Sequence, residues 1–285
     1  MTNSISLFDL KPGKVLEDRF EIIRSFRQGG MSATFEVREG DNVSELQVFP
    51  SGLFESPEQA AEFGASLQSW ERVKSPSMLK VREVIAKSDG TILLLTEFPP
   101  ASSLREWLDE NGNMGIEESV ALGLRLLDGL IEAHMSGLVH GDIKPYTIRF
   151  DGSDPATSVL VDGGITTCLW SAKHLGEKTA LIGTPIYAPA EQFGGDSPEV
   201  QSDVYNLATV LFEMIAGTVP WPGQSFLEIF QAKLDKTPPS FSRAAPKLEI
   251  PRELERAIIG GLMTDKRERY GSAEEFRDAL RAAAE

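Results

Sequence analysis

Two aspartates in the middle of the chain follow short apolar segments and are candidates for one chemical task. Asp142 lies in the loop 140–145, which leads into a predicted strand at 148–150. Asp162 directly follows a second apolar stretch at 159–161. Both carboxylates are therefore predicted at the ends of neighbouring β elements. Paired carboxylates in such places suit a reaction in which one orients a hydroxyl and the other holds a metal ion.

The first third of the chain has the sequence pattern of a β-sheet with one helix. Alternating apolar and polar residues predict five strands, at 20–26, 34–37, 43–49, 81–86 and 92–97. A helix is predicted from Ser56, because a capping serine is followed by proline and, three positions after the serine, by glutamine. Residues 1–17 are polar and read as a loose lead-in. Since the residues Phe98-Pro99-Pro100 cannot continue a regular strand, we expect the sheet to end there.

The rest of the chain is predominantly helical. Apolar residues at helical spacing predict helices around 104–108, 120–134, 202–215, 226–234, 254–262 and 272–283. Ser272 with Glu275 repeats the capping pattern. We therefore expect an α+β chain with a small β lobe at 18–98 and a larger helical lobe at 99–285. A ligand cleft is expected at their junction.

The composition excludes several classes of protein. The chain has 285 residues, 41% of them hydrophobic, with a net charge of −15, which argues against nucleic acid or an anionic membrane as the main partner. The single cysteine, Cys168, excludes an internal disulfide, so the cytoplasm is the expected compartment. No apolar run approaches the ~20 residues of a membrane helix, and the N-terminus has no signal-peptide pattern. Cys168 is expected to be inert and His140 to be a packed core residue.

Several motifs together resemble the bacterial Ser/Thr protein kinases of the Hanks type, over roughly residues 18–283. They are His-Gly-Asp-Ile-Lys-Pro at 140–145, Gly-Thr-Pro-Ile-Tyr at 183–187 with Glu191, Ser-Asp-Val-Tyr at 202–205, and Asp-Lys-Arg-Glu-Arg at 265–269. The resemblance implies a two-lobed protein-kinase fold that uses ATP and Mg²⁺.

The resemblance also implies roles for individual residues. Asp142 would orient the substrate hydroxyl, Lys144 would contact the transferred phosphate and Asp162 would hold the metal. Glu97 and Phe98, at the end of the last predicted strand, would contact the nucleotide. Two further implications are structural: Asp203 would hold the amides of the Asp142 loop, and Glu191 would pair with Arg269.

The phosphate-handling positions depart from the family pattern. In the glycine-rich loop only Gly29 keeps its place, and Arg27 and Ser32 replace the other two glycines. Gln47 stands where the family has the lysine that neutralises the phosphates, and no lysine occurs from residue 15 to residue 73. Thr147 replaces the asparagine that holds a metal, and is at best a weak ligand.

Two further departures concern the loops around the aspartates. Gly163 replaces a phenylalanine that packs the metal-binding loop, and Gly141 replaces the arginine that precedes Asp142. Without that arginine, a phosphate on Thr166, Thr167 or Thr179 would lack its usual receiving group.

These departures favour a pseudokinase, a protein-binding or scaffolding module with a degraded ATP site and weak or absent nucleotide binding. The alternative is an ATP- and Mg-dependent Ser/Thr kinase of low activity. The identity of a protein partner is not readable from the residues. Many relatives continue into further domains, and the chain stops close to where such a kinase unit would finish.

Overall fold

The computed structural model describes residues 7–28, 31–152, 154–173, 184–234 and 237–285. The chain divides into two compact units. The first comprises the residues up to 74, then 79–99 and 171–173, and the second comprises 75–78, 100–170 and the residues from 174 onward.

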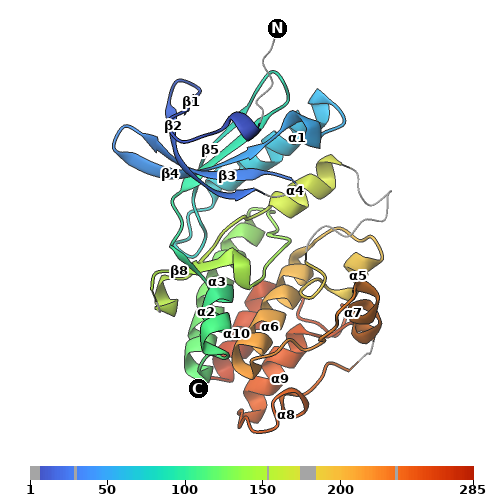
Figure 1. Ribbon diagram of the computed structural model, residues 1–285. Helices are drawn as coiled ribbons and strands as arrows, with labels where there is room; N and C mark the ends of the chain where they lie inside the picture. The colour runs from blue at the N-terminus through green and yellow to red at the C-terminus, as the bar shows by residue number, and fades with distance from the viewer. Residues whose placement is uncertain (1–6, 29–30, 153, 174–183, 235–236) are drawn as a thin grey trace. The chain divides into compact units, whose positions relative to one another are not determined.

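An antiparallel sheet forms most of the first unit (Figure 1). It has six strands, in the order β1-β2-β3-β4-β6-β5. The strands are β1 (Val15–Leu16), β2 (Phe20–Gln28), β3 (Ala33–Glu39), β4 (Asn42–Phe49), β5 (Val81–Ala86) and β6 (Ile92–Glu97). Their alternation places apolar side chains such as Phe35, Val37 and Leu46 in one buried cluster. Five of the six strands are the predicted ones, and β6 ends at Glu97, directly before Phe98-Pro99-Pro100.

The additional strand lies in the stretch that was predicted to be a loose lead-in. β1 pairs Val15 with Glu21 and Leu16 with Phe20. Leu10 and Leu16 are 4% and 5% exposed and belong to the core of the sheet. For residues 7–17 the prediction of a loose lead-in is therefore wrong. A two-residue strand is too short to show the alternation by which strands are recognised.

The main helix of the first unit, α1 (Pro57–Gln68), begins as the capping pattern predicts. The Ser56 side chain accepts a hydrogen bond from the Gln59 amide, and Gln59 Oε1 accepts one from the Glu55 amide. Its buried face includes Phe63 and Leu67, and the helix packs beside β5. The Phe63 ring meets the Phe49 ring edge-on at 4.9 Å, which joins the helix to the sheet.

The second unit is mainly helical, and four of its helices, α3, α6, α9 and α10, pack against one another (Figure 1). Its helices are α2 (Leu104–Asn111), α3 (Ile116–Met135), α5 (Ala190–Phe193), α6 (Val200–Ala216), α7 (Phe226–Lys233), α8 (Phe241–Ala244), α9 (Arg252–Gly261) and α10 (Ala273–Ala282), together with α4 (Ile165–Ala172) except for its last two residues, which belong to the first unit. The strands β7 (Ser102–Ser103), β8 (Ile148–Phe150) and β9 (Val159–Leu160) form a small sheet.

Most of these helices lie where the apolar spacing predicts them, and Ser272 caps α10 as expected. The helix α4, which begins three residues after Asp162, was not predicted. Within the described part of the chain, no helix combines the length and the apolar character that crossing a membrane requires.

Candidate functional site

The loop that carries Asp142 is hydrogen-bonded to Asp203, a fully buried residue near the start of α6. Asp203 Oδ2 accepts a hydrogen bond from the His140 amide, and Oδ1 accepts one from the Gly141 amide, each at 2.8 Å. His134 Nε2 lies 2.9 Å from Oδ2. A buried carboxylate is stable only when such donors replace its water. The predicted role of Asp203 as the anchor of the loop amides is confirmed.

The packing of His140 and Cys168 also agrees with the predictions. His140 is 0% exposed, and its Nε2 lies 2.9 Å from the Val161 carbonyl oxygen. Burial raises the pKa of the Cys168 thiol to about 12, so the thiol stays protonated at neutral pH.

Asp142, Lys144 and Thr184 form one polar group in the second unit. Lys144 Nζ hydrogen-bonds to Asp142 Oδ2 and donates to Thr184 Oγ1 at 3.0 Å. The Thr184 amide donates to Asp142 Oδ1 at 3.3 Å. The side chains of Asp142 and Lys144 are each 19% exposed. A carboxylate, an ammonium and a hydroxyl in this arrangement can orient a second hydroxyl and hold a negative charge. Thr184 was not predicted as a site residue, although the motif at 183–187 contains it.

Thr147 is directed into the backbone of the same loop. It closes a 3₁₀ turn at Pro145–Thr147 and is 2% exposed. Its Oγ1 accepts a hydrogen bond from the Lys144 amide at 3.1 Å. The hydroxyl proton is within reach of the Lys144 carbonyl at 3.0 Å and the Asp142 carbonyl at 3.2 Å. The hydroxyl is thus engaged in shaping the loop.

Asp162 lies next to this loop through its neighbour, because the Val161 amide donates to the Thr147 carbonyl at 2.9 Å. Asp162 has a φ of +62°, in the left-handed region that aspartate tolerates better than most residues. Across the described ranges, no group of three or more His, Cys, Asp or Glu side chains is placed to hold a metal ion.

The predicted nucleotide contacts lie in the first unit. Gln47, on β4, is 9% exposed, and its Nε2 donates to Ser32 Oγ at 2.9 Å. Gln47 and Ser32, two residues that depart from the family pattern, are therefore hydrogen-bonded to each other. Gly29 lies outside the described residues.

Glu97 and Phe98 lie at the end of β6. Glu97 pairs with Ser44 in the sheet, and its Oε1 is 3.7 Å from Lys80 Nζ. The Phe98 ring is 5.4 Å from the Phe26 ring of β2. The sheet thus brings Glu97 and Gln47 onto the neighbouring strands β6 and β4.

The segment that follows Thr184 is fixed by a buried lysine. Lys233, at the end of α7, is 0% exposed and donates from Nζ to the Ile186 and Ala188 carbonyls, each at 2.8 Å. The same Nζ is 3.2 Å from the Tyr205 hydroxyl oxygen. Burial lowers the pKa of Lys233 to about 7. This contact was not predicted from the sequence, because a lysine at the end of a helix is usually exposed.

Two charged contacts complete the anchoring of this segment. Arg269 Nη1 donates to Glu191 Oε1 at 2.7 Å and Nη2 to Oε2 at 3.2 Å, so the predicted pair is confirmed. Tyr187 donates its hydroxyl to Glu213 Oε2 at 2.7 Å, and Arg105 donates to Oε1 of the same carboxylate at 2.7 Å. Burial raises the pKa of Tyr187, so the phenol remains protonated.

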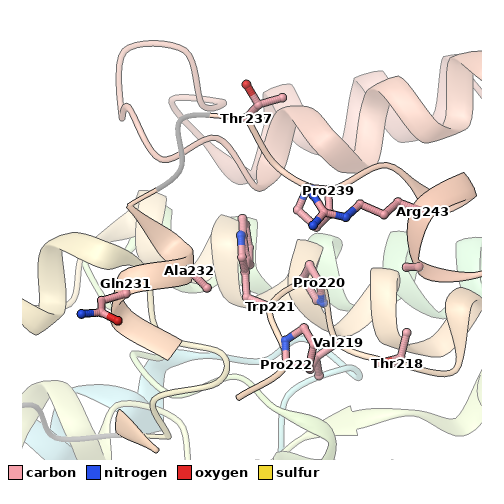
Figure 2. Close-up of a pocket in the computed structure, with 11 residues that line it drawn as sticks. Thr218, Val219, Pro220, Trp221, Pro222, Gln231, Ala232, Thr237, Pro239 and Arg243 are labelled. Atoms are coloured by element: carbon pink, nitrogen blue, oxygen red, sulfur yellow. The ribbon is translucent and has the colours of Figure 1, made fainter. Parts of the chain in front are cut away.

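A pocket of about 580 Å³ lies among the loop after α6, helix α7 and helix α8. Figure 2 shows Trp221, Pro220, Pro239 and Arg243 among its walls. The Trp221 ring also lies 5.3 Å from Lys233 Nζ. None of the predicted site residues lines this pocket.

Comparison with known proteins identifies the family. The protein kinase domain family matches residues 53–279, and the chain belongs to this family. It is 26% identical over 267 residues to a probable serine/threonine-protein kinase PknB of Lactococcus lactis, covering 93% of this chain and 42% of that protein. It is 25% identical over 273 residues to the serine/threonine-protein kinase PrkC of Bacillus subtilis, covering 95% of this chain and 41% of that protein. The chain thus spans about two fifths of the length of these relatives.

Solved structures share the fold. The kinase domain of Mycobacterium tuberculosis PknI superposes with a TM-score of 0.73 at 19% identity, covering 96% of this chain and 99% of that one. A structure of Rad53 residues 1–466 in complex with AMP-PNP gives a TM-score of 0.75 at 16% identity, covering 92% of this chain and 64% of that one. The predicted two-lobed protein-kinase fold and the bacterial Ser/Thr type are both confirmed.

Proposed function

We propose that this chain is a pseudokinase, a kinase-shaped module of the bacterial Ser/Thr type that binds Mg-ATP weakly or not at all. Its role is to bind and regulate protein partners in the cytoplasm. We further propose that residues 18–98 and 99–285 are the two lobes of one kinase domain.

The observation that carries this proposal is the hydrogen bond between Gln47 and Ser32. The family uses a lysine at position 47 to neutralise the α- and β-phosphates. Here the side chain is a neutral amide, and one of its N–H groups is already engaged. No lysine from residue 15 to residue 73 could take its place. Loss of one preorganised donor typically lowers a rate by about 10²–10³, and the loss of a cation facing phosphates is at least as costly.

The second support is the state of Thr147. A magnesium ligand must offer an oxygen that is free to point at the ion. The Thr147 hydroxyl is instead enclosed among the Lys144 amide and two carbonyls of its own loop. As they stand, the side chains at positions 47 and 147 do not fit a magnesium nucleotide.

A weakly active Ser/Thr kinase is the second candidate, and one specific observation favours it. Asp142, Lys144 and Thr184 form a hydrogen-bonded group that is suited to orient a substrate hydroxyl. In that case Asp142 would orient the hydroxyl, Lys144 would contact the transferred phosphate and Asp162 would hold the metal.

A phosphotransfer assay separates the two candidates. The purified chain is incubated with γ-labelled ATP, Mg²⁺ and a generic protein substrate, and Asp142→Asn serves as the matched control. The pseudokinase proposal predicts equal, background labelling by both proteins. Labelling that is robust in the wild type and abolished by Asp142→Asn would establish the enzyme instead.

A paired substitution locates the defect. Gln47→Lys together with Thr147→Asn restores the two family side chains. If the missing groups are the cause, the double variant should bind Mg-ATP more tightly than either single variant. If binding of the nucleotide does not improve, the missing groups are not the cause.

A further inference from the structure

The helix α4 is fastened to the loop that carries Asp142. At the start of the helix, the Gly164 amide donates to the His140 carbonyl at 3.2 Å. One turn later, Thr167 Oγ1 donates to the Val139 carbonyl at 3.1 Å. These two bonds reach the residues immediately before Gly141 and Asp142. The position of the helix and the path of the loop are therefore coupled.

Thr167 lies close to Gly141, where no side chain separates the two segments. A Cβ atom at this position would lie 2.4 Å from Thr167 Oγ1 and 3.2 Å from Pro198 Cβ. Cβ atoms in proteins essentially never come within 3.0 Å of a non-bonded heavy atom, so a side chain at 141 would displace Thr167. Gly141 also has a φ of +82°, which only glycine adopts without strain. Glycine is thus required on two independent grounds.

We propose that Gly141 is a socket for Thr167: the missing side chain at 141 leaves the space that Thr167 occupies, and this contact holds α4 against the Asp142 loop. An arginine at position 141, the residue that the family has there, would clash with Thr167 of α4. The Thr167 hydroxyl donates to the Val139 carbonyl at 3.1 Å, so phosphorylation of this hydroxyl would break the bond. A phosphate there would add about two negative charges and would displace the helix.

This socket is independent of whether the chain transfers phosphate, because its test involves neither nucleotide nor metal. The test is a double-mutant cycle with Gly141→Ala, Thr167→Ala and the two together, read by thermal unfolding. The matched control is Gly137→Ala. Gly137 has a φ of +72°, in the same region, but no atom lies within 4 Å of a Cβ built there.

In Gly137→Ala only the strain of an alanine in the left-handed region is added, which should lower the melting temperature by roughly 2–4 °C. Gly141→Ala should lower it at least about twice as much, because the clash is added to the same backbone cost. In the Thr167→Ala background, the additional effect of Gly141→Ala should become clearly smaller, although Pro198 Cβ, 3.2 Å from the added Cβ, keeps it above that of the control. If Gly141→Ala costs the same in both backgrounds, Thr167 does not occupy a socket at Gly141.

Hydrogen exchange provides a second measurement on a variant that keeps the glycine. Thr167→Ala removes the bond to Val139, so the amides of α4 should exchange at least about tenfold faster than in the wild type. The amides of α6, which the variant does not touch, should keep their protection. Unchanged exchange across α4 would show that Thr167 does not hold the helix and would overturn the proposal.

Discussion

The buried lysine under the segment 186–188 gives a sharp prediction about pH. Lys233 is 0% exposed, and its three hydrogen-bond partners are two carbonyls and a phenol. Burial lowers its pKa from 10.5 to about 7; Glu191 opposes the shift, and Arg269 adds to it. Between these two values the unfolded chain carries a proton on this lysine that the folded chain has lost.

The sign and size of the effect follow from proton linkage. Since the unfolded state binds more protons between pH 7 and 10.5, this lysine makes the free energy of unfolding rise with pH in that window. The rise approaches 1.4 kcal/mol per pH unit when one full proton separates the two states. From pH 7.5 to 8.5 the free energy of unfolding of the wild type should therefore rise by about 1 kcal/mol relative to that of Lys233→Met.

Urea unfolding at these two pH values measures the difference. Lys247→Met, which removes an exposed lysine, is the matched control. If the free energy of unfolding of the wild type stays constant or falls relative to that of Lys233→Met as the pH rises, the burial of Lys233 in this cluster is refuted.

Three further substitutions test other contacts. Glu191→Gln breaks the pair with the buried Arg269 and should lower the free energy of unfolding by about 3–5 kcal/mol in urea titrations; a loss below about 1 kcal/mol would contradict a buried pair. Asp203→Ala leaves two loop amides without an acceptor, at about 1–3 kcal/mol each, and these amides should exchange faster; slow exchange would mean that they have another partner. Thr147→Val removes the hydroxyl from its turn and should lower the free energy of unfolding by about 1–3 kcal/mol in the absence of any metal; an unchanged free energy would mean that the loop does not need this hydroxyl, which would then be available to a metal ion.

The parts of this molecule that the sequence predicted rest on local rules. The Ser56 and Ser272 caps satisfy helix amides within three residues, so the pattern is complete in a few letters. The strands of the first unit are long enough to show alternation. The contacts of Asp203 and of Glu191 with Arg269 were predicted from motifs, because each residue sits in a specific string of neighbours.

The unpredicted parts rest on contacts between distant segments. Helix α4 contains Ile165, two threonines and Cys168, which are weak helix formers. Its Thr167 hydroxyl donates instead to the Val139 carbonyl, a partner distant in the sequence. Lys233 and the bond between Gln47 and Ser32 were missed for the same reason, since no spacing rule links such partners.

The central claim is that the positions which should hold the phosphates and the metal no longer do so. The most direct measurement is the melting temperature of the chain with and without millimolar Mg-ATP. A ligand at 100 times its Kd stabilises the folded state by about 2.7 kcal/mol, which is a shift of several degrees. We expect no shift for the wild type and a rise for the variant with Gln47→Lys and Thr147→Asn. A rise of several degrees for the wild type would contradict it.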